Sequence, residues 1–313
     1  MHDLRVFREH VDALRDGMRR RSKLDQYDAS IDEGVLLDQR RRSAIQAVEE
    51  KKAARNANSQ EVARRKKAGE DATGLIAAGR ALGDEIAVLE NELAAAENRL
   101  NELLLDLPNV TLDEVPAGGE EANRVERTWG TPRPSDGVKA HWEIGEALGI
   151  LDLMRGAKVS GSGFVFFRGL GARLVRALIT WFVDTHVREH GYEEIWTPVL
   201  VNRATMVGTG QLPKFEEDMY ALRDDPLYLI PTAEVSVTNL YRDEILEASA
   251  LPRGFVAYSP CFRREAGAAG KDTRGLLRMH QFDKVEIVRY CTPEQSADEH
   301  ERLTRHAEAL LER

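Results

Sequence analysis

The segment from Phe262 to Glu286, FRREAGAAGKDTRGLLRMHQFDKVE, combines residues that suit a nucleotide and a small charged ligand. Two strand-like pieces flank a glycine-rich loop that carries arginines and a lysine. A strand can hold the planar guanidinium of Arg263 rigidly against phosphate, and Phe282 can stack on a base. Glu265 and Glu286 add acceptors for an exocyclic amine and an ammonium group. These residues predict a site for nucleotide phosphate and a small cation; a basic hairpin without a ligand is the alternative.

A second segment, IPTAEVSVTN (230–239), contains an acceptor pair for an ammonium group. Glu234 offers a charge, and the short hydroxyl of Thr232 suits a small substrate. Thr232 also follows Pro231 at the start of a predicted helix, where a hydroxyl commonly caps the first amides. The residues alone leave both roles open.

The surrounding chain, 141–313, alternates predicted strands with predicted helices. Apolar periodicity predicts a helix over 172–191 and a second over 233–246. Predicted strands lie at 193–201, 226–232, 255–265 and 282–291. The sequence therefore predicts an α+β domain whose largely antiparallel β-sheet is flanked by helices.

Residues 28–107 have the composition of long helices, with no proline and many Ala, Glu, Arg, Lys and Leu. An apolar heptad seam runs along the second half, at Leu82, Ile86, Leu89, Leu93, Ala96, Leu100, Leu103 and Leu107. A turn is predicted at 68–74. We expect an antiparallel helical hairpin, a coiled-coil arm, with an intermolecular coiled coil as the alternative. The predicted organisation is an arm at 1–107, a linker at 108–140 and the α+β domain at 141–313, which would be the catalytic domain if the candidate site binds its ligands.

The formal net charge of −9 argues against a general nucleic-acid coat. Locally, however, residues 40–67 hold ten Lys or Arg against three Glu. Such a run is either a solvated helix face or a stripe that attracts a phosphate backbone.

The two cysteines, Cys261 and Cys291, form no C-x-x-C pair, so the sequence predicts neither a zinc site nor a disulfide framework. No apolar run is long enough to span a membrane, and the N-terminus has no apolar signal region. We therefore expect a soluble cytoplasmic protein with no membrane partner.

The string from Phe262 to Glu286 resembles motif 2 of class II aminoacyl-tRNA synthetases, in the bacterial seryl-tRNA synthetase form F-R-x-E-A-G-x-A-G-x-D-T-R-G-L-x-R-x-H-Q-F-x-K-V-E. The resemblance implies that Arg263, Glu265 and Arg278 are catalytic, with Arg263 at the α-phosphate and Arg278 at the outer phosphates. The implied ATP-binding residues are Arg263, Arg264, Glu265, Met279, His280, Gln281 and Phe282. The implied serine-binding residues are Thr232, Ala233, Glu234, Arg263 and Glu286.

Two further matches extend the resemblance over the whole chain. Residues 161–215 resemble the region around motif 1, which would place Pro198 at a homodimer interface; an ordinary strand-bend proline is the alternative. DLRVFRE (3–9) and the helical hairpin resemble the family's tRNA-binding arm. The resemblance implies contacts to tRNA(Ser), and also to tRNA(Sec), from the arm residues Arg40, Arg41, Lys51, Lys52, Arg55, Arg64 and Arg65.

The implied reaction has two steps. The serine carboxylate attacks ATP to form seryl-adenylate, and the terminal ribose hydroxyl of tRNA then takes the acyl group. Nothing in the sequence matches the family's third motif, so we expect the Mg²⁺ ligands outside this chain and no metal site within it. We interpret the chain as C-terminally incomplete and expect it to be inactive alone in adenylate formation. The alternatives are a non-catalytic tRNA-binding or dimerisation module and a relative that loads a carrier protein, although such relatives lack the arm.

Overall fold

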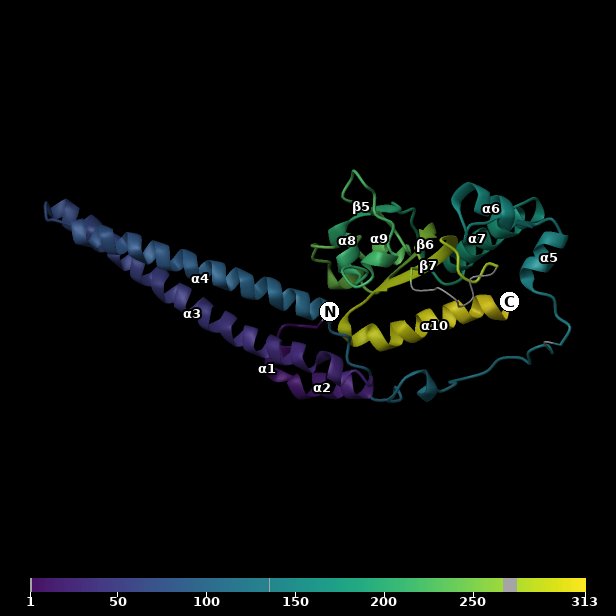
Figure 1. Ribbon diagram of the computed structural model, residues 1–313, viewed down its shortest axis with the longest axis horizontal. Helices are drawn as coiled ribbons and strands as arrows, with labels where there is room; N and C mark the ends of the chain where they lie inside the picture. The colour runs from purple at the N-terminus through teal and green to yellow at the C-terminus, as the bar shows by residue number, and fades with distance from the viewer. Residues whose placement is uncertain (1, 135, 267–274) are drawn as a thin grey trace. The chain divides into compact units, whose positions relative to one another are not determined.

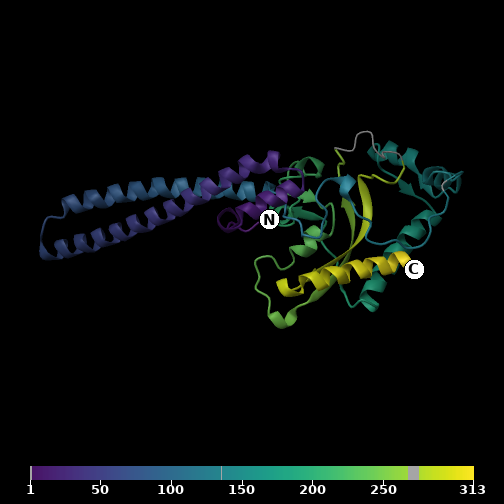
Figure 2. The same cartoon turned by 90° about the horizontal axis from the view of Figure 1, so that it is seen from below.

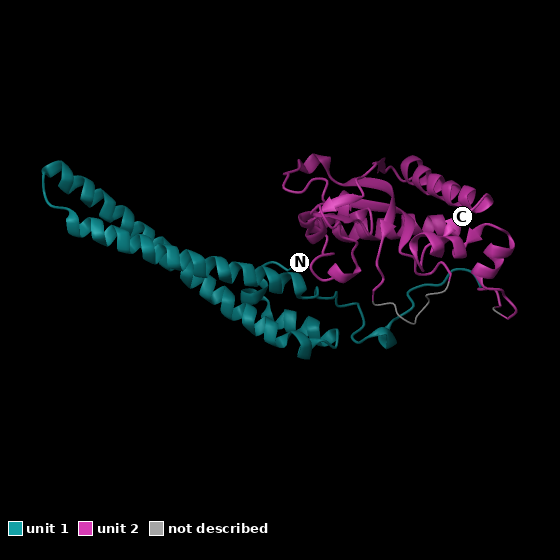
Figure 3. Ribbon diagram, turned by 45° about the horizontal axis from the view of Figure 1, so that its top comes forward, with its two compact units in different colours: residues 1–131 teal, residues 132–313 magenta. Residues whose placement is uncertain are grey.

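The computed structural model describes residues 2–134, 136–266 and 275–313. The chain forms two compact units, 1–131 and 132–313, which are coloured separately in Figure 3. The division falls within the predicted linker, whose bounds stay a prediction. The glycine-rich part of the candidate nucleotide segment, 267–274, lies outside the described residues.

Unit 1 contains the predicted hairpin within one chain. It is formed by the long helices α3 (Leu24–Ala68) and α4 (Thr73–Asp106), which run side by side in Figures 1 and 2. The seam residues Ile86, Leu100 and Leu103 are buried, as the heptad pattern requires. Two contacts fix the antiparallel pairing: Arg99 forms a fork-like pair with Glu33, and the Asn58 amide donates to the Leu75 carbonyl over 2.8 Å. The hairpin prediction is therefore confirmed.

A tight turn reverses the chain at the tip of the hairpin. Gly69 ends α3 in the left-handed region at φ +71, which glycine adopts without steric cost. The Asp71 carboxylate accepts from the Thr73 amide at 2.9 Å and from its hydroxyl at 2.6 Å, and so satisfies the first turn of α4.

Two short helices, α1 (Val6–Glu9) and α2 (Val11–Arg20), pack against the base of the arm. Their apolar side chains form one core with the hairpin, composed of Val6, Phe7, Leu14, Met18, Tyr27, Ile31, Leu100, Leu103, Leu104 and Leu107. Gly34 lies within α3 because Phe7 occupies the adjacent space: a Cβ there would approach the ring to 2.4 Å. The Arg20 guanidinium donates to carbonyls of Leu112, Asp113 and Val115, which fastens the first part of the predicted linker to α2. A short turn of 3₁₀ helix, η1, follows at Glu120–Ala122.

Unit 2 is built on a three-stranded sheet in the order β3–β6–β7 (Figure 1). The two long strands are β6 (Arg253–Phe262) and β7 (Gln281–Tyr290), which pair antiparallel from end to end. The short strand β3 (Glu193–Glu194) runs parallel to β6. The mixed α+β class is as predicted, with one parallel pair in the sheet.

Two small antiparallel sheets and several helices surround the long strands. β1 (Leu151–Asp152) pairs with β2 (Phe166–Phe167), and β4 (Leu200–Asn202) pairs with β5 (Leu227–Leu229). The predicted strand at 193–201 is thus split between β3 and β4, and the predicted helix at 233–246 is shorter than expected. The helices are α5 (His141–Ala147), α6 (Leu153–Ser160), α7 (Leu170–Arg188), α8 (Arg203–Gly208), α9 (Glu234–Thr238) and α10 (Ser296–Glu312). The 3₁₀ turns are η2 (Glu216–Asp218), η3 (Ala248–Ala250) and η4 (Pro293–Gln295).

The two faces of the β6–β7 pair pack against different helices. On one face, Phe255 and Ala257 bury themselves against Ala233 and Val237 of the α9 region. On the other face, Val256 packs with Val183 of α7 and with Leu303 of α10. Among the residues that the structure describes, no helix is both long and apolar enough to cross a membrane.

Three histidines meet where α7, α10 and the loop before β3 come together. The Nδ1 atoms of His186 and His190 lie 3.0 Å apart, and the rings of His190 and His306 stack at 4.0 Å. Tyr192 contacts His306 Nδ1 through its hydroxyl at 2.9 Å. His186 is only 3% exposed, and burial, followed by the other two histidines, lowers its pKa to about 4. Burial also lowers the pKa of His306 to about 4.

This cluster predicts a loss of stability in acid. Both imidazoles become charged near pH 6.5 in the unfolded chain but stay neutral in the folded chain until about pH 4. The free energy of unfolding is therefore highest above pH 6.5 and decreases as the pH falls from 6.5 to 4. For His186 this decrease is about 2 kcal/mol, a value that allows for partial solvation of the ring. Urea unfolding across this range should show a shallower pH dependence for His186→Gln than for wild type, whereas the exposed His300→Gln should behave as wild type. Equal pH dependence in all three proteins would contradict this assignment.

Candidate active site

The register of β6 and β7 places the candidate ligands on one face of the sheet. Cys261 lies opposite Phe282, Ser259 opposite Lys284, and Ala257 opposite Glu286. Because side chains alternate along a strand, Phe282, Lys284 and Glu286 share the face on which Ala257 packs against α9. Cys261 is buried on this same face, and its burial raises the pKa of its thiol.

Three predicted serine ligands come together at one end of this face. The Thr232 hydroxyl donates to Glu286 Oε2 at 2.6 Å and accepts from the Glu234 amide at 3.2 Å. Thr232 is therefore both a turn-stabilising residue at the start of α9 and a partner of Glu286, so its two predicted roles are compatible. Removal from water, and secondly the charge of Glu286, raise the pKa of the Glu234 carboxyl, while Lys284 opposes the shift.

Lys284 is a candidate functional residue that was not predicted from the sequence. Its Nζ lies 2.7 Å from Glu286 Oε2, on the same oxygen that accepts from Thr232. Its signal in the sequence was the alternation F-D-K-V-E, which puts Phe282, Lys284 and Glu286 on one face of a strand. Ala233 is fully buried against Phe255, so any ligand contact from it would involve its backbone.

The predicted nucleotide residues at the other end of the face fall into two groups. The guanidinium of Arg263 lies 5.2 Å from the centroid of the Phe282 ring, so these two candidates are brought together. The Arg263 amide donates to the His280 carbonyl at 3.0 Å and continues the strand ladder past Phe262. A base that stacked on the same face of Phe282 would have to displace this guanidinium.

The second group lies in the connection between the two strands. Glu265 adopts a left-handed conformation, with φ +51, and its Oε2 accepts from Arg278 Nη1 at 3.1 Å. Arg264 turns away from both, since its Nη1 donates to the Glu217 carbonyl at 3.1 Å. The structure thus uses Arg264 to attach the connection to η2.

Met279 and Gln281 border a cavity of about 580 Å³ formed with α6, β2 and α7. Met279, Gln281 and Phe282 line it directly, along with aromatic residues such as Phe164 and Phe182. The His280 ring instead contacts the Arg263 carbonyl at 3.0 Å and lies 5.3 Å from the Phe164 ring. Side chains from both faces of β7 line this cavity. This is possible because β7 lies at the edge of the described sheet.

Pro198 lies in the exposed bend where the chain leaves β3 and enters β4. Its carbonyl accepts from the Ser236 hydroxyl at 2.8 Å. Pro198 therefore lies in the connection between two strands, and a role at a dimer interface stays a prediction.

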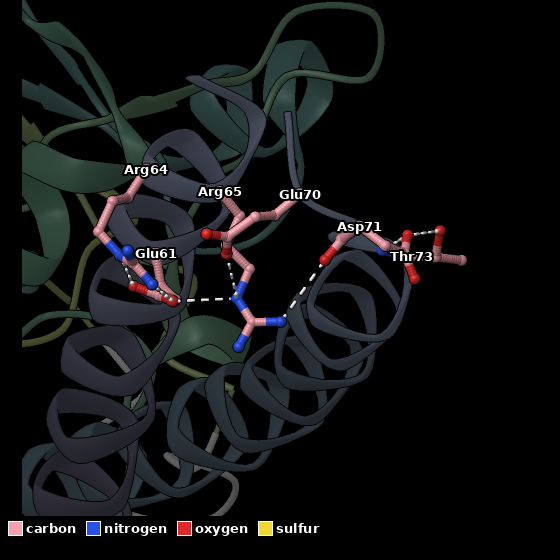
Figure 4. Close-up of polar contacts among 6 residues, drawn as sticks. All are labelled: Glu61, Arg64, Arg65, Glu70, Asp71 and Thr73. Carbon is pink, nitrogen blue, oxygen red and sulfur yellow. Dashed lines mark hydrogen bonds and ion pairs between the residues drawn. The ribbon is translucent and has the colours of Figure 1, made fainter. Parts of the chain in front are cut away.

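The predicted arm cations differ in their partners. Arg41, Lys51 and Lys52 of α3 pair across the hairpin with Glu97, Glu85 and Glu90 of α4. Arg64 and Arg65 both pair with Glu61 at the tip (Figure 4), and these bonds lower the pKa of the Glu61 carboxyl to about 2. Within the described parts of the chain, Arg40 and Arg55 make no ion pair.

Family comparisons cover both units. The seryl-tRNA synthetase N-terminal domain matches residues 1–111, and the class II tRNA synthetase core domain (G, H, P, S and T) matches residues 215–313. A serine–tRNA ligase of Gemmatimonas aurantiaca is 59% identical, over all of this chain and 74% of its own length. A serine–tRNA ligase of Methylacidiphilum infernorum is 50% identical over 99% of this chain and 74% of its own length.

Solved structures agree with the sequence relatives. The seryl-tRNA synthetase of Pyrococcus horikoshii, solved with ATP, superposes with a TM-score of 0.89 at 34% identity, covering 100% of this chain and 74% of that one. A cytoplasmic serine–tRNA ligase of Naegleria fowleri, solved with AMP, gives a TM-score of 0.82 at 26% identity, covering 99% of this chain and 75% of that one. With a matched N-terminal domain, a matched class II core and relatives this similar, the chain belongs to the seryl-tRNA synthetase family of class II aminoacyl-tRNA synthetases.

Proposed function

We propose that the β6–β7 face carrying Arg263, Phe282 and Glu286 binds serine and ATP as one wall of the site where seryl-adenylate forms, and that the arm holds the tRNA that receives the serine. The observation that carries this proposal is the common face: the candidate phosphate ligand, the base-stacking ring and the ammonium acceptor all come from one strand pair. The chain is a serine–tRNA ligase by family, and this face carries groups suited to binding serine and ATP.

The serine end is suited to a small zwitterion. Glu286 already holds one ammonium group, that of Lys284, and Glu234 lies close enough for the two carboxylates to repel. A serine ammonium group would relieve that repulsion and form charge-assisted hydrogen bonds. The Thr232 hydroxyl completes a polar site for serine, and a substrate that left these groups unpaired would bind more weakly.

The nucleotide end supplies positive charge where it is needed. Arg263 is fixed by the strand ladder and would stabilise charge at the α-phosphate, while Arg278 would reach the outer phosphates. The serine carboxylate oxygen attacks the α-phosphorus, and the bond to the bridging oxygen breaks to release pyrophosphate. The tRNA terminal hydroxyl then attacks the acyl carbon and releases AMP. Catalysis rests on positioning and charge stabilisation, with no nucleophilic side chain.

In the described ranges, no group of three His, Cys, Asp or Glu side chains is arranged to hold a metal ion. The requirement for Mg²⁺ stays a prediction, and no step above depends on it.

We also propose a homodimer that includes the Pro198 bend. The neighbouring Trp196 is 82% exposed, and α7 exposes Leu174, Leu178 and Trp181 on successive turns. Large exposed apolar side chains are common at protein interfaces. Sedimentation equilibrium that showed only monomers at micromolar concentration would refute this part.

Recognition of tRNA(Sec) and a cytoplasmic location stay predictions. The two free thiols suit a reducing compartment.

The serine site makes a direct prediction. Glu286→Gln should weaken serine binding about 10- to 100-fold, because it removes a charged partner of the ammonium group. Serine affinity in wild type should also fall in mildly acidic solution, since Glu234 with its raised pKa takes up a proton there more readily than an ordinary carboxyl. Isothermal titration with serine measures both effects. Glu247→Gln, an exposed acid of the same unit, is the matched control and should bind as wild type. Unchanged affinity in Glu286→Gln would contradict the assignment.

The arm makes a second prediction, based on which cations are free. Arg40→Ala and Arg55→Ala should each weaken binding of a tRNA(Ser) transcript and reduce the slope of log K against log salt by about 1, because each removes an unpaired phosphate ligand. A transcript without its long variable arm should respond much less. Filter binding over a salt series makes the measurement. Lys23→Ala, an exposed cation outside the basic run, is the control. Equal effects of all three substitutions would show a diffuse field rather than contacts at Arg40 and Arg55.

A further inference from the structure

The connection between β6 and β7 is held at both described ends by a side-chain acceptor from an earlier element. The Ala266 amide donates to Asp218 Oδ1 at 3.0 Å, and the Leu276 amide donates to His141 Nε2 at 2.8 Å. We propose that Asp218 and His141 are positioning residues that clamp these two ends and thereby fix Arg278, which donates to Glu265, for the outer phosphates of ATP. This inference rests on the proposed function and adds the residues that set the geometry of its phosphate site.

Asp218 contacts the connection through both its side chain and its backbone. It lies in η2, and its backbone carbonyl also accepts from the Arg264 amide at 2.8 Å. The neighbouring Glu216 pairs with Arg203 of α8 at 2.7 Å, and Tyr228 of β5 joins the same carboxylate. The clamp at Ala266 is therefore anchored to elements that do not belong to the sheet face itself.

His141 holds the other end from the first residue of α5. Gly275 comes directly before the clamped Leu276, and it adopts φ +84. A Cβ at Gly275 would approach His141 Nε2 to 2.3 Å and the Trp142 ring to 2.6 Å, so only glycine allows this close approach. In this contact Nε2 of His141 is the acceptor and the Leu276 amide is the donor.

The pair that the clamp would position lies just beside the two clamped amides. Glu265 precedes Ala266 and holds a left-handed conformation that is unfavourable for a residue with a side chain. Arg278 follows Leu276 by two residues and donates to Glu265 at 3.1 Å. Arg263, by contrast, is held by the strand ladder through the His280 carbonyl and does not need the clamp.

This difference gives a readout that a general structural role would not produce. Loss of the clamp should loosen Arg278, which the proposed function assigns to the outer phosphates, and leave Arg263 and Phe282 in place. Binding of ATP should therefore weaken while binding of AMP stays unchanged. A variant that simply loosened the unit would weaken both nucleotides together.

The experiment uses the full chain and begins with the alanine variants Asp218→Ala and His141→Ala. They are compared with the conservative variants Asp218→Asn and His141→Gln, whose side chains still offer a hydrogen-bond acceptor. Isothermal titration measures ATP and AMP separately. We expect the alanine variants to bind ATP about tenfold more weakly and AMP as wild type does, and the conservative variants to recover most of the loss. Hydrogen exchange at the amides of 266 and 276 should accelerate at 266 in Asp218→Ala and at 276 in His141→Ala.

Unchanged exchange at these amides in the alanine variants, or equal weakening of ATP and AMP, would overturn the proposal. Wild type that bound neither nucleotide would contradict the proposed function, and in that case the amide exchange would still decide whether Asp218 and His141 hold the connection.

Discussion

The register between β6 and β7 is the constraint on which the candidate site depends. Ten residue pairs run from Arg253–Tyr290 to Phe262–Gln281, and they place Ala257 opposite Glu286 and Cys261 opposite Phe282. A slip of one residue would turn Phe282, Lys284 and Glu286 to the opposite face. The apolar side chains prevent this, because Phe255 and Ala257 are buried against α9 while Val256 is buried against α7 and α10. The packing that stabilises unit 2 therefore also orders the groups for serine and the nucleotide.

Elements from outside the sheet complete the site by contacts that depend on that register. Thr232 precedes α9 and reaches Glu286 because α9 packs on the same face. Asp218 and His141 reach the connection between the strands from η2 and α5. The arm, in contrast, gains its stability from its own seam and from the cluster at its base, so its binding surface is built independently of the sheet.

The sequence allowed much of this arrangement to be predicted, for identifiable reasons. The seam from Leu82 to Leu107 repeats a local pattern, and a local pattern is enough to predict a helical hairpin. Arg263 and Glu286 lie within a string that is distinctive in itself. Contacts between distant parts of the chain could not be predicted in this way. The hydrogen bond from Leu276 to His141, for example, spans 135 positions, and no sequence periodicity indicates it. The same limit applies to Arg264, whose contact with Glu217 depends on where η2 packs, and to the arm cations, whose free or paired state depends on which glutamates face them across the hairpin.

Binding of a stable seryl-adenylate mimic tests the central claim that one face of β6–β7 holds both serine and nucleotide. Calorimetry would compare 5′-O-(N-L-seryl)sulfamoyladenosine with 5′-O-sulfamoyladenosine, which lacks the seryl group. If the two ends of the face act together, the seryl compound should bind about 100-fold more tightly to wild type, and Glu286→Gln should remove most of that advantage. Equal affinities of the two compounds for wild type would contradict the account.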